Sequence, residues 1–392
     1  MRSVAGLTGS LAIHLRRNPF PAYAVMRRVA PVFHDRRHDL WMLFGFDGVK
    51  RALHDPEAFS SRAAPPGDKP LDWLIFQDPP LHTKLRAIIM RTFTPRAIAA
   101  LEPRIRLLCR GLLDPAIERG AMDVAADFAV PLPLLVIAEM LGIPADDRAP
   151  LKRWSEAILG LSAAVAGGET AARATSAFRN AKTEMGPFVA RLLEQRRTRP
   201  ADDLLTRLVE AEVDGDRLSE ADILGFFQLL LLAGSETTTN LIGSAVLCLA
   251  ENPDQLARLR AEPDLLPSAI EEVLRYRPPV QAVFRQTRRD VELGGRTIPA
   301  GKLVMAMIGS ANRDPRQFRH PRRFDVARDP NPHVAFGHGI HFCIGAPLAR
   351  LEARIALGDF LARAPRFRLD GRWMPGLSFH VHGPTRLPIR FT

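Results

Sequence analysis

The sequence predicts a mainly α-helical chain with a small β region, which is an α+β protein built as one domain over 1–392. Apolar residues recur at helical spacing across most of 83–274, for example in 105–116 and 172–196. Short β-type runs between glycine and proline turns occur near 31–46, 291–308 and 378–392. No repeat, linker or low-complexity segment divides the chain, so we expect a single domain.

The composition is that of a globular protein, with 46% apolar and 25% charged residues. The three cysteines are far apart and do not resemble a disulfide framework, which favours the cytoplasm. We find no signal-peptide pattern and no apolar run of about 20 residues, so we expect no membrane anchor.

The net charge of +11 favours an acidic partner, but no block of like charges marks a nucleic-acid arm. A nucleic-acid-binding protein is therefore the weakest alternative, and we expect no nucleic acid.

The first predicted elements are a hairpin within 31–46 and a helix near 47–54. The most distinctive element is a long helix that begins after Ser219, a suitable N-cap, and continues to about Glu251, roughly 48 Å. Its middle, AGSETTTN at 233–240, contains weak helix formers. We expect the Thr237 hydroxyl to bond to the carbonyl of Ala233 and loosen the helix. One interpretation is that another group docks against this polar stretch. The alternative is that the glycine serves only helix packing and that the threonine hydroxyls form hydrogen bonds within their own helix.

The stretch 336–345, FGHGIHFCIG, places Cys343 among glycines just before a predicted helix at 347–362. Gly337, Gly339 and Gly345 allow positive φ and close approach to a large flat group. Backbone N–H groups at a helix N-terminus are expected to lower the pKa of the Cys343 thiol. One thiolate suits an iron held by a macrocycle, whereas zinc requires several such ligands. The alternative is a buried free cysteine, which is our interpretation of Cys109 and Cys248.

The pattern FxxGxxxCxG, matched by Phe336, Gly339, Cys343 and Gly345, resembles the haem-binding signature of the cytochrome P-450 superfamily, in its soluble bacterial form. Further stretches are similar to family motifs in the same order along the chain: DPPLHTKLR at 78–86, AGSET at 233–237, EVLR at 272–275 and PRRF at 321–324.

This resemblance implies the cytochrome P-450 fold, a triangular prism, with haem b (iron protoporphyrin IX) as cofactor. It implies that Cys343 is the proximal iron ligand and that Phe336 packs beside its sulfur. The other residues that it implies near the cofactor are His82, Arg86, Arg285 and His341 as cations for the haem carboxylates, together with Gly345, Ala233 and Gly234. The family's RxA is RQT at Arg285, so the third position of that motif departs from the family pattern.

The resemblance also implies roles for residues away from the sulfur. Glu236 and Thr237 resemble an acid–alcohol pair that delivers protons, with Ala233 and Gly234 leaving room for oxygen. Glu272, Arg275 and Arg323 resemble a buried structural cluster in which a carboxylate lies between two guanidiniums. The implied substrate pocket is apolar, and we assign to it Trp73, Phe76, Phe226, Leu230, Val280, Val283 and Phe379.

The implied function is a monooxygenase that inserts one atom of O2 into an apolar organic substrate, such as a fatty acid, terpenoid, steroid or macrolide-like compound. No flavin or ferredoxin module is recognised in the sequence, so we expect electrons from a separate ferredoxin and its reductase. Arg350 and Arg354 are candidates to steer that partner, and we expect a monomer. The alternative is a haem-thiolate sensor or ligand carrier without turnover, against which the Glu236–Thr237 pair argues.

Overall fold

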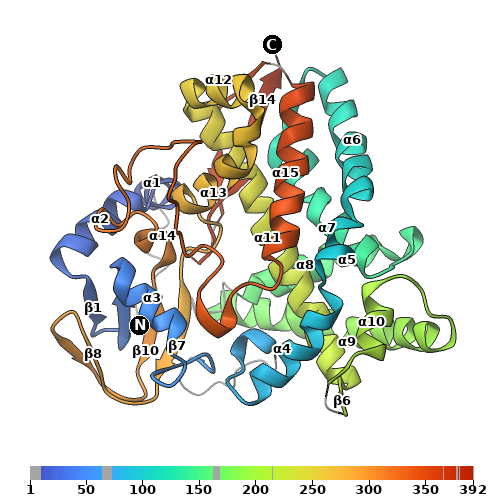
Figure 1. Ribbon diagram of the computed structural model, residues 1–392, viewed down its shortest axis with the longest axis horizontal. Coiled ribbons are helices and arrows are strands. Elements are labelled where there is room, and N and C mark those ends of the chain that lie inside the picture. The colour runs from blue at the N-terminus through green and yellow to red at the C-terminus, as the bar shows by residue number, and fades with distance from the viewer. Residues whose placement is uncertain are drawn as a thin grey trace.

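The computed structural model describes residues 10–63, 73–161, 168–213, 215–364, 366–376, 378 and 380–391. Helices dominate it, as predicted, and the largest sheet lies on one side. In Figure 1 the helices α6 (Glu102–Glu118), α7 (Pro131–Met140), α11 (Glu220–Glu251) and α15 (Ala346–Arg363) lie together on the right. The N-terminal helices and the main sheet lie on the left, so the cysteine loop before α15 runs between a helical and a β-rich part.

The β-rich part contains the predicted hairpin and a five-stranded sheet of order β1-β2-β10-β7-β3. Strand β10 pairs in parallel with β2 and antiparallel with β7. Strand β7 was not predicted, because its short run VFRQT lacks apolar alternation. The elements of this part are α1 (Ser10–Arg17), α2 (Phe20–Val29), β1 (Val32–Asp35), β2 (Leu40–Leu43), α3 (Phe46–His54), β3 (Phe59–Ser60), β7 (Val283–Thr287), β8 (Val291–Leu293), β9 (Arg296–Ile298), β10 (Leu303–Ala306) and α14 (Ile308–Ala311).

The turn between β8 and β9 is formed by Gly294 and Gly295, which adopt positive φ angles of 58° and 72°. The two strands pair antiparallel around it. A tight hairpin requires left-handed backbone at these positions, which glycine adopts without steric cost. The predicted turn at this position is confirmed.

The helical part surrounds α11 and contains the larger apolar core. Short strands pair at its edges, in sheets that combine β4 with β11 and β14, β5 with β6, and β12 with β13. Its remaining elements are η2 (Leu74–Phe76), α4 (Leu81–Thr92), α5 (Pro95–Ala99), β4 (Ala121–Asp123), η3 (Val124–Ala129), η4 (Ala145–Asp147), α8 (Ala149–Gly160), α9 (Gly168–Thr198), α10 (Leu204–Glu210), β5 (Glu212–Val213), β6 (Asp216–Arg217), α12 (Pro253–Ala261), η6 (Pro263–Leu265), α13 (Leu266–Tyr276), η7 (Gly339–His341), β11 (Phe367–Leu369), β12 (Met374–Pro375), β13 (Pro384–Arg386) and β14 (Pro388–Phe391).

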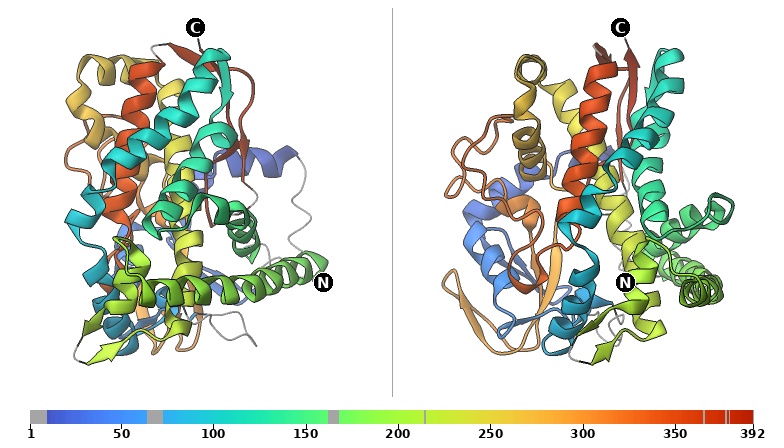
Figure 2. Two further views of the ribbon diagram at one scale, coloured as in Figure 1. Left: turned by 90° about the vertical axis from the view of Figure 1, so that its right-hand side faces the viewer. Right: turned by 45° about the vertical axis from the view of Figure 1, so that its right-hand side comes forward.

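Helix α11 is the predicted long helix, with 32 residues. Ser219 caps its N-terminus: its hydroxyl accepts from the N–H of Asp222, and the Asp222 side chain accepts from the N–H of Ser219. Helices α7, α8 and α15 pack against it, and Figure 2 shows α9 crossing it steeply. Its C-terminal half is buried almost continuously, so the helix is a fixed axis on which side chains in its middle are positioned. No helix of the described residues is long and apolar enough to cross a membrane.

Helix α15 carries a buried acid that no motif had indicated. Glu352 is 1% exposed, and its Oε2 atom has no hydrogen-bond partner in the described part of the chain. Burial raises the pKa of this carboxyl to about 8. The folded chain therefore holds this proton more tightly than the unfolded chain, and the contribution of Glu352 to stability falls as pH rises toward 8.

We expect the Glu352→Gln variant to be about as stable as the unaltered chain near pH 5, and more stable than it above pH 8. Glutamine keeps the size of the side chain but needs no proton to remain neutral. Thermal unfolding midpoints of both proteins across this pH range measure the difference. A difference in midpoint that stays the same at every pH would contradict a neutral, buried Glu352.

Candidate active site

The cysteine loop is anchored by backbone hydrogen bonds and by glycine. The Cys343 N–H donates to the Phe336 carbonyl at 2.9 Å, which closes the loop just before α15. Gly337 and Gly339 have φ angles of 77° and 72°, as the sequence predicted. Gly345 has φ of −78°, so it does not use the positive φ that glycine allows. A Cβ on Gly345 would lie 3.9 Å from the Cys343 sulfur, an ordinary van der Waals contact, so this residue lies directly beside the sulfur.

Gly339 has a packing role that the sequence did not indicate. A Cβ at this position would lie 2.9 Å from the Cα of His54 and 3.0 Å from the carbonyl of Leu53. These distances are too short for any side chain. The glycine therefore lets the cysteine loop rest on the C-terminal end of α3, and it joins the loop to the β-rich part.

The Cys343 thiol differs from the sequence prediction in its pKa. Solvent reaches the side chain, but the surrounding protein desolvates a charge on the sulfur and raises the pKa above its ordinary value. The N–H groups of Gly345 and Ala346 and the charges of Arg86 and Arg350 oppose this effect. The N–H groups at the helix N-terminus thus do lower the pKa of Cys343, as expected, but by less than burial raises it. A positive partner at the sulfur, such as a metal ion, favours the thiolate.

Four basic side chains converge near this loop: His82, Arg86, Arg285 and His341. The rings of His82 and His341 lie 4.2 Å apart between centroids. Both ring nitrogens of His82 are buried without a hydrogen-bond partner. Arg285 is 8% exposed, and its Nη1 atom donates to the carbonyl of Phe284 at 2.7 Å. Within the described part of the chain, none of the four forms an ion pair with a carboxylate.

The electrostatics of this basic cluster favour an anionic ligand. Burial, with the charge of Arg86, lowers the pKa of His82 to about 4. Burial, with His82 and Arg285, lowers the pKa of His341 to about 3. Burial also lowers the pKa of Arg285 to about 10. Burial thus makes each side chain less easily charged than in water, and an anion placed among them would favour the charged forms.

The middle of α11 presents an acid and an alcohol side by side. The Thr237 hydroxyl donates to the Ala233 carbonyl at 2.5 Å, so the predicted bond to the preceding turn is confirmed. Ala233 is exposed although the helix passes through the protein interior, so one face of α11 is open at this point. Burial raises the pKa of Glu236 to about 7. Such a carboxyl can take up and release a proton near neutral pH.

Gly234 does not share the open face of Ala233. A Cβ on Gly234 would lie 2.9 Å from the Cδ1 atom of Ile137 in α7. This glycine therefore allows α11 to pack closely on α7. The prediction that Gly234 leaves room for oxygen is corrected to a packing role, because one residue along a helix turns the side chain by about 100°.

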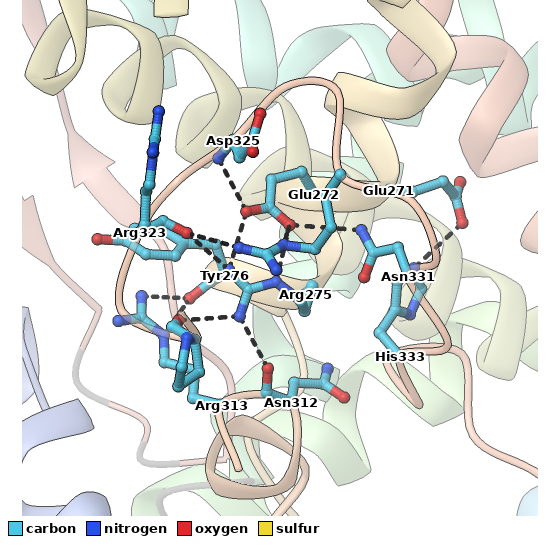
Figure 3. Close-up of polar contacts among 12 residues, drawn as sticks. Glu271, Glu272, Arg275, Tyr276, Asn312, Arg313, Arg323, Asp325, Asn331 and His333 are labelled. Carbon is cyan, nitrogen blue, oxygen red and sulfur yellow. Dashed lines mark hydrogen bonds and ion pairs between the residues drawn. The ribbon is translucent and has the colours of Figure 1, made fainter. Parts of the chain in front are cut away.

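The Glu272–Arg275 pair forms the predicted buried cluster, but with a different third member. Both side chains have no exposed surface, and the Arg275 Nε and Nη2 atoms donate to the two Glu272 carboxylate oxygens at 2.7 and 2.8 Å. The second guanidinium is that of Arg328, whose Nε donates to Glu272 at 2.9 Å. Arg323 is exposed and contributes only its carbonyl, which accepts from Arg275 at 3.1 Å. Figure 3 shows the Arg323 side chain directed away from Glu272.

A sequence model of the family described as cytochrome P-450 matches residues 167–370, just over half of the chain. The chain belongs to the cytochrome P-450 family. Among similar proteins, the putative cytochrome P-450 YjiB of Bacillus subtilis (strain 168) is 42% identical over 89% of this chain and 88% of its own length. Vitamin D(3) 25-hydroxylase of Pseudonocardia autotrophica is 41% identical over 95% of this chain and 94% of its own.

Solved structures give the same result. CYP109E1 from Bacillus megaterium, crystallised in complex with testosterone, is 40% identical, has a TM-score of 0.88 and covers 96% of this chain and 99% of its own. The chain thus has the cytochrome P-450 fold and is a cytochrome P-450 monooxygenase with a haem-thiolate cofactor. The basic cluster fits this cofactor, because haem carries two carboxylates and the cluster supplies donors that have no carboxylate of their own.

The residues assigned to the substrate pocket of this cytochrome P-450 occupy two kinds of surroundings. Trp73 and Phe226 are buried: the Trp73 Nε1 atom donates to Gln228, and the Phe226 ring packs edge-on against Phe93. The partly exposed ones are Phe76, Leu230, Val280 and Val283. Phe379 lies outside the described residues. The pocket assignment as a whole stays a prediction.

Sequence reasoning missed two side chains that organise this cytochrome P-450 and one contact of a residue that it had named for another role. Arg328 completes the Glu272 cluster, and Ser61 bonds to His341 at 2.9 Å. Arg350, named as a steering candidate, lies over the Phe336 ring at 4.5 Å. Each contact joins residues far apart in sequence. No local pattern could have indicated them, because a serine or an arginine outside a motif has no characteristic spacing.

Proposed function

We propose that this monooxygenase uses haem b, with Cys343 as the iron ligand, to hydroxylate an apolar organic substrate of the fatty acid, terpenoid, steroid or macrolide-like class. The overall reaction is RH + O2 + two electrons + two protons giving ROH + water. The observation that carries the catalytic part is the pair formed by Glu236, with its pKa near 7, and Thr237 on the open face of α11. A sensor or carrier would not need a proton-delivering pair at this position.

The cofactor, when bound to the Cys343 sulfur, supplies electron transfer and activation of O2. The chain contributes the surroundings. The N–H groups of Gly345 and Ala346 disperse negative charge on the sulfur. His82, Arg86, Arg285 and His341 would hold the haem carboxylates.

Protons reach the reacting oxygen through α11 in this proposal. Glu236 takes a proton from water and releases it inward, because its pKa of about 7 keeps both protonation states populated at neutral pH. The Thr237 hydroxyl already donates to the Ala233 carbonyl, so its oxygen is free to accept from a water and hold it in place. The pair therefore delivers protons at one fixed position.

The Thr237→Ala variant should still consume reductant, but its product yield per electron should fall about tenfold, with the missing electrons recovered as peroxide. Losing the hydroxyl leaves the water unheld, so protons arrive at the wrong place. Coupling of reductant to product is measured with a surrogate ferredoxin and reductase. Thr239→Ala is the matched control, because its hydroxyl bonds instead to the Ala129 carbonyl at 2.9 Å. Full coupling in Thr237→Ala would contradict the assigned role.

The substrate class is supported by two observations. The assigned pocket residues are aliphatic or aromatic, and the similar proteins include one named for hydroxylating vitamin D(3) and one crystallised with testosterone. The test is a titration of the haem-loaded protein with fatty acids, steroids, terpenoids and macrolides, followed by the Soret absorption shift. Binding of only small charged molecules would overturn the proposal.

The electron donor in this proposal is a separate ferredoxin with its reductase. Arg350 and Arg354, the candidates to steer it, both form ion pairs within the chain. Arg350 donates twice to Glu271, at 2.7 Å each, and Arg354 donates to Glu102 at 2.9 Å. These two ion pairs border a groove of about 480 Å³ between α5, α13 and α15. Measuring the rate of reduction against ionic strength tests how much charge guides docking, and a rate independent of salt would contradict electrostatic steering.

A further inference from the structure

Ser61, which directly follows β3, connects the β-rich part to the cysteine loop. It is 3% exposed, and its hydroxyl oxygen lies 2.9 Å from the Nε2 atom of His341. Its backbone N–H donates to the Oδ1 atom of Asp78 at 2.8 Å. The backbone of Ser61 is therefore fixed by Asp78, while its side chain contacts His341 of the basic cluster.

The Asp78 carboxylate that holds Ser61 is itself fixed on both oxygens. Its Oδ2 atom accepts from the Ser60 hydroxyl at 2.5 Å and from the Arg288 Nη2 atom at 2.7 Å. Asp78 is 6% exposed, so solvent does not compete for these bonds. The position of Ser61 relative to the loop is thus set by a buried network, and rotation of its hydroxyl is the freedom that remains.

The direction of the Ser61–His341 bond follows from the lack of another acceptor. Within the described residues, the Ser61 hydroxyl has no hydrogen-bond partner except the His341 Nε2 atom. A buried hydroxyl that accepted from Nε2 would leave its own proton unsatisfied, at a cost of desolvation. With the hydroxyl as donor, Nε2 carries a lone pair, and a neutral imidazole then has its proton on Nδ1.

The Nδ1 atom of His341 has no hydrogen-bond partner in the described part of the chain. The other members of the basic cluster around this ring are donors without a carboxylate: both nitrogens of His82 are buried and unpartnered, and Arg285 is 8% exposed. An acceptor nitrogen at this position would repel an anionic oxygen, whereas an N–H would bind it.

We propose that Ser61 is a positioning residue that fixes the His341 ring with its N–H at Nδ1, so that this histidine donates a hydrogen bond to a haem carboxylate. This inference rests on the proposed function, because it assumes that the basic cluster holds haem. It adds a residue outside that cluster that controls how tightly the cofactor is held.

The experiment compares Ser61→Ala with Ser61→Thr, each in the unaltered chain and in a His341→Phe background. The first readout is the rate at which haem transfers to excess apomyoglobin, and the second is the ferric–ferrous midpoint potential. We expect Ser61→Ala to speed haem transfer about fivefold, the effect of losing one hydrogen bond, and to shift the potential. Ser61→Thr, which keeps a hydroxyl, should restore both. In the His341→Phe background, Ser61→Ala should change neither.

A third readout shows the tautomer directly. In the diamagnetic ferrous carbonyl form, nitrogen-15 spectra of labelled histidine should place the His341 proton on Nδ1 in the unaltered chain, and should change in Ser61→Ala. Equal effects of Ser61→Ala in both backgrounds would show a merely structural role and overturn the inference. Unchanged transfer and potential in Ser61→Ala would also overturn it. A chain that bound no haem at all would instead refute the proposed function.

Discussion

Replacing Cys343 with histidine should abolish monooxygenase turnover while the chain still folds. Cys343 is not a member of the apolar core clusters, so the change removes no core packing. An imidazole can bind iron, but it does not donate the negative charge that favours cleavage of the O–O bond. We expect product formation to fall at least ~10²-fold, the scale of losing a group that acts on the reacting centre. The ferrous carbonyl spectrum of the variant should show imidazole-type ligation.

The matched controls for this variant are Cys109→Ala and Cys248→Ala. Both cysteines are fully buried in the large apolar core, to which Cys343 does not belong, and burial raises the pKa of each thiol to about 12. These variants should keep the sulfur-type carbonyl spectrum and most of the activity. Loss of that spectrum in either control, or its survival in Cys343→His, would assign the ligand to a different residue.

Replacing Glu272 with glutamine should destabilise the fold severely. The Glu272 carboxylate accepts from Arg275, from Arg328 and from the N–H of Asp325 at 3.0 Å, and the carboxylate itself has no contact with solvent. Removing its charge leaves the fully buried Arg275 guanidinium unpaired, which costs about 3–5 kcal/mol. That is a large share of the stability of an ordinary domain. The urea midpoint of unfolding should fall correspondingly, and expression of the variant should be poor.

Two arginine variants separate this cluster from the one that the sequence predicted. Arg328→Ala removes a guanidinium that bonds to Glu272, so it should cost about 1–3 kcal/mol. Arg323→Ala removes an exposed side chain and keeps the carbonyl that Arg275 uses, so the change should stay within about 0.5 kcal/mol. A larger loss for Arg323→Ala than for Arg328→Ala would contradict the observed geometry.

The elements that the sequence predicted correctly have local causes. Helix α11 is specified by the cap at Ser219 and by a long apolar pattern, and the turn at Gly294 and Gly295 by its glycines. The Thr237 bond to Ala233 follows from helical spacing alone. The cysteine loop was located because Cys343 stands in a spacing that few other sequences share.

The elements that were predicted wrongly depend on contacts between distant segments. Arg323 and Arg328 have the same chemistry, and only the path of the chain after α14 decides which one reaches Glu272. Gly234 contacts Ile137 of α7, a neighbour that no local pattern names. The pKa of Cys343 is raised because burial outweighs two N–H groups, and a sequence does not state how deeply a thiol lies.

The most direct test of thiolate ligation is the ferrous carbonyl spectrum of the purified, haem-loaded chain. Ligation by the Cys343 thiolate predicts the long-wavelength Soret band that sulfur ligation produces, with one haem per chain. A spectrum of imidazole type, or a chain that stays colourless after haem is supplied, would contradict it.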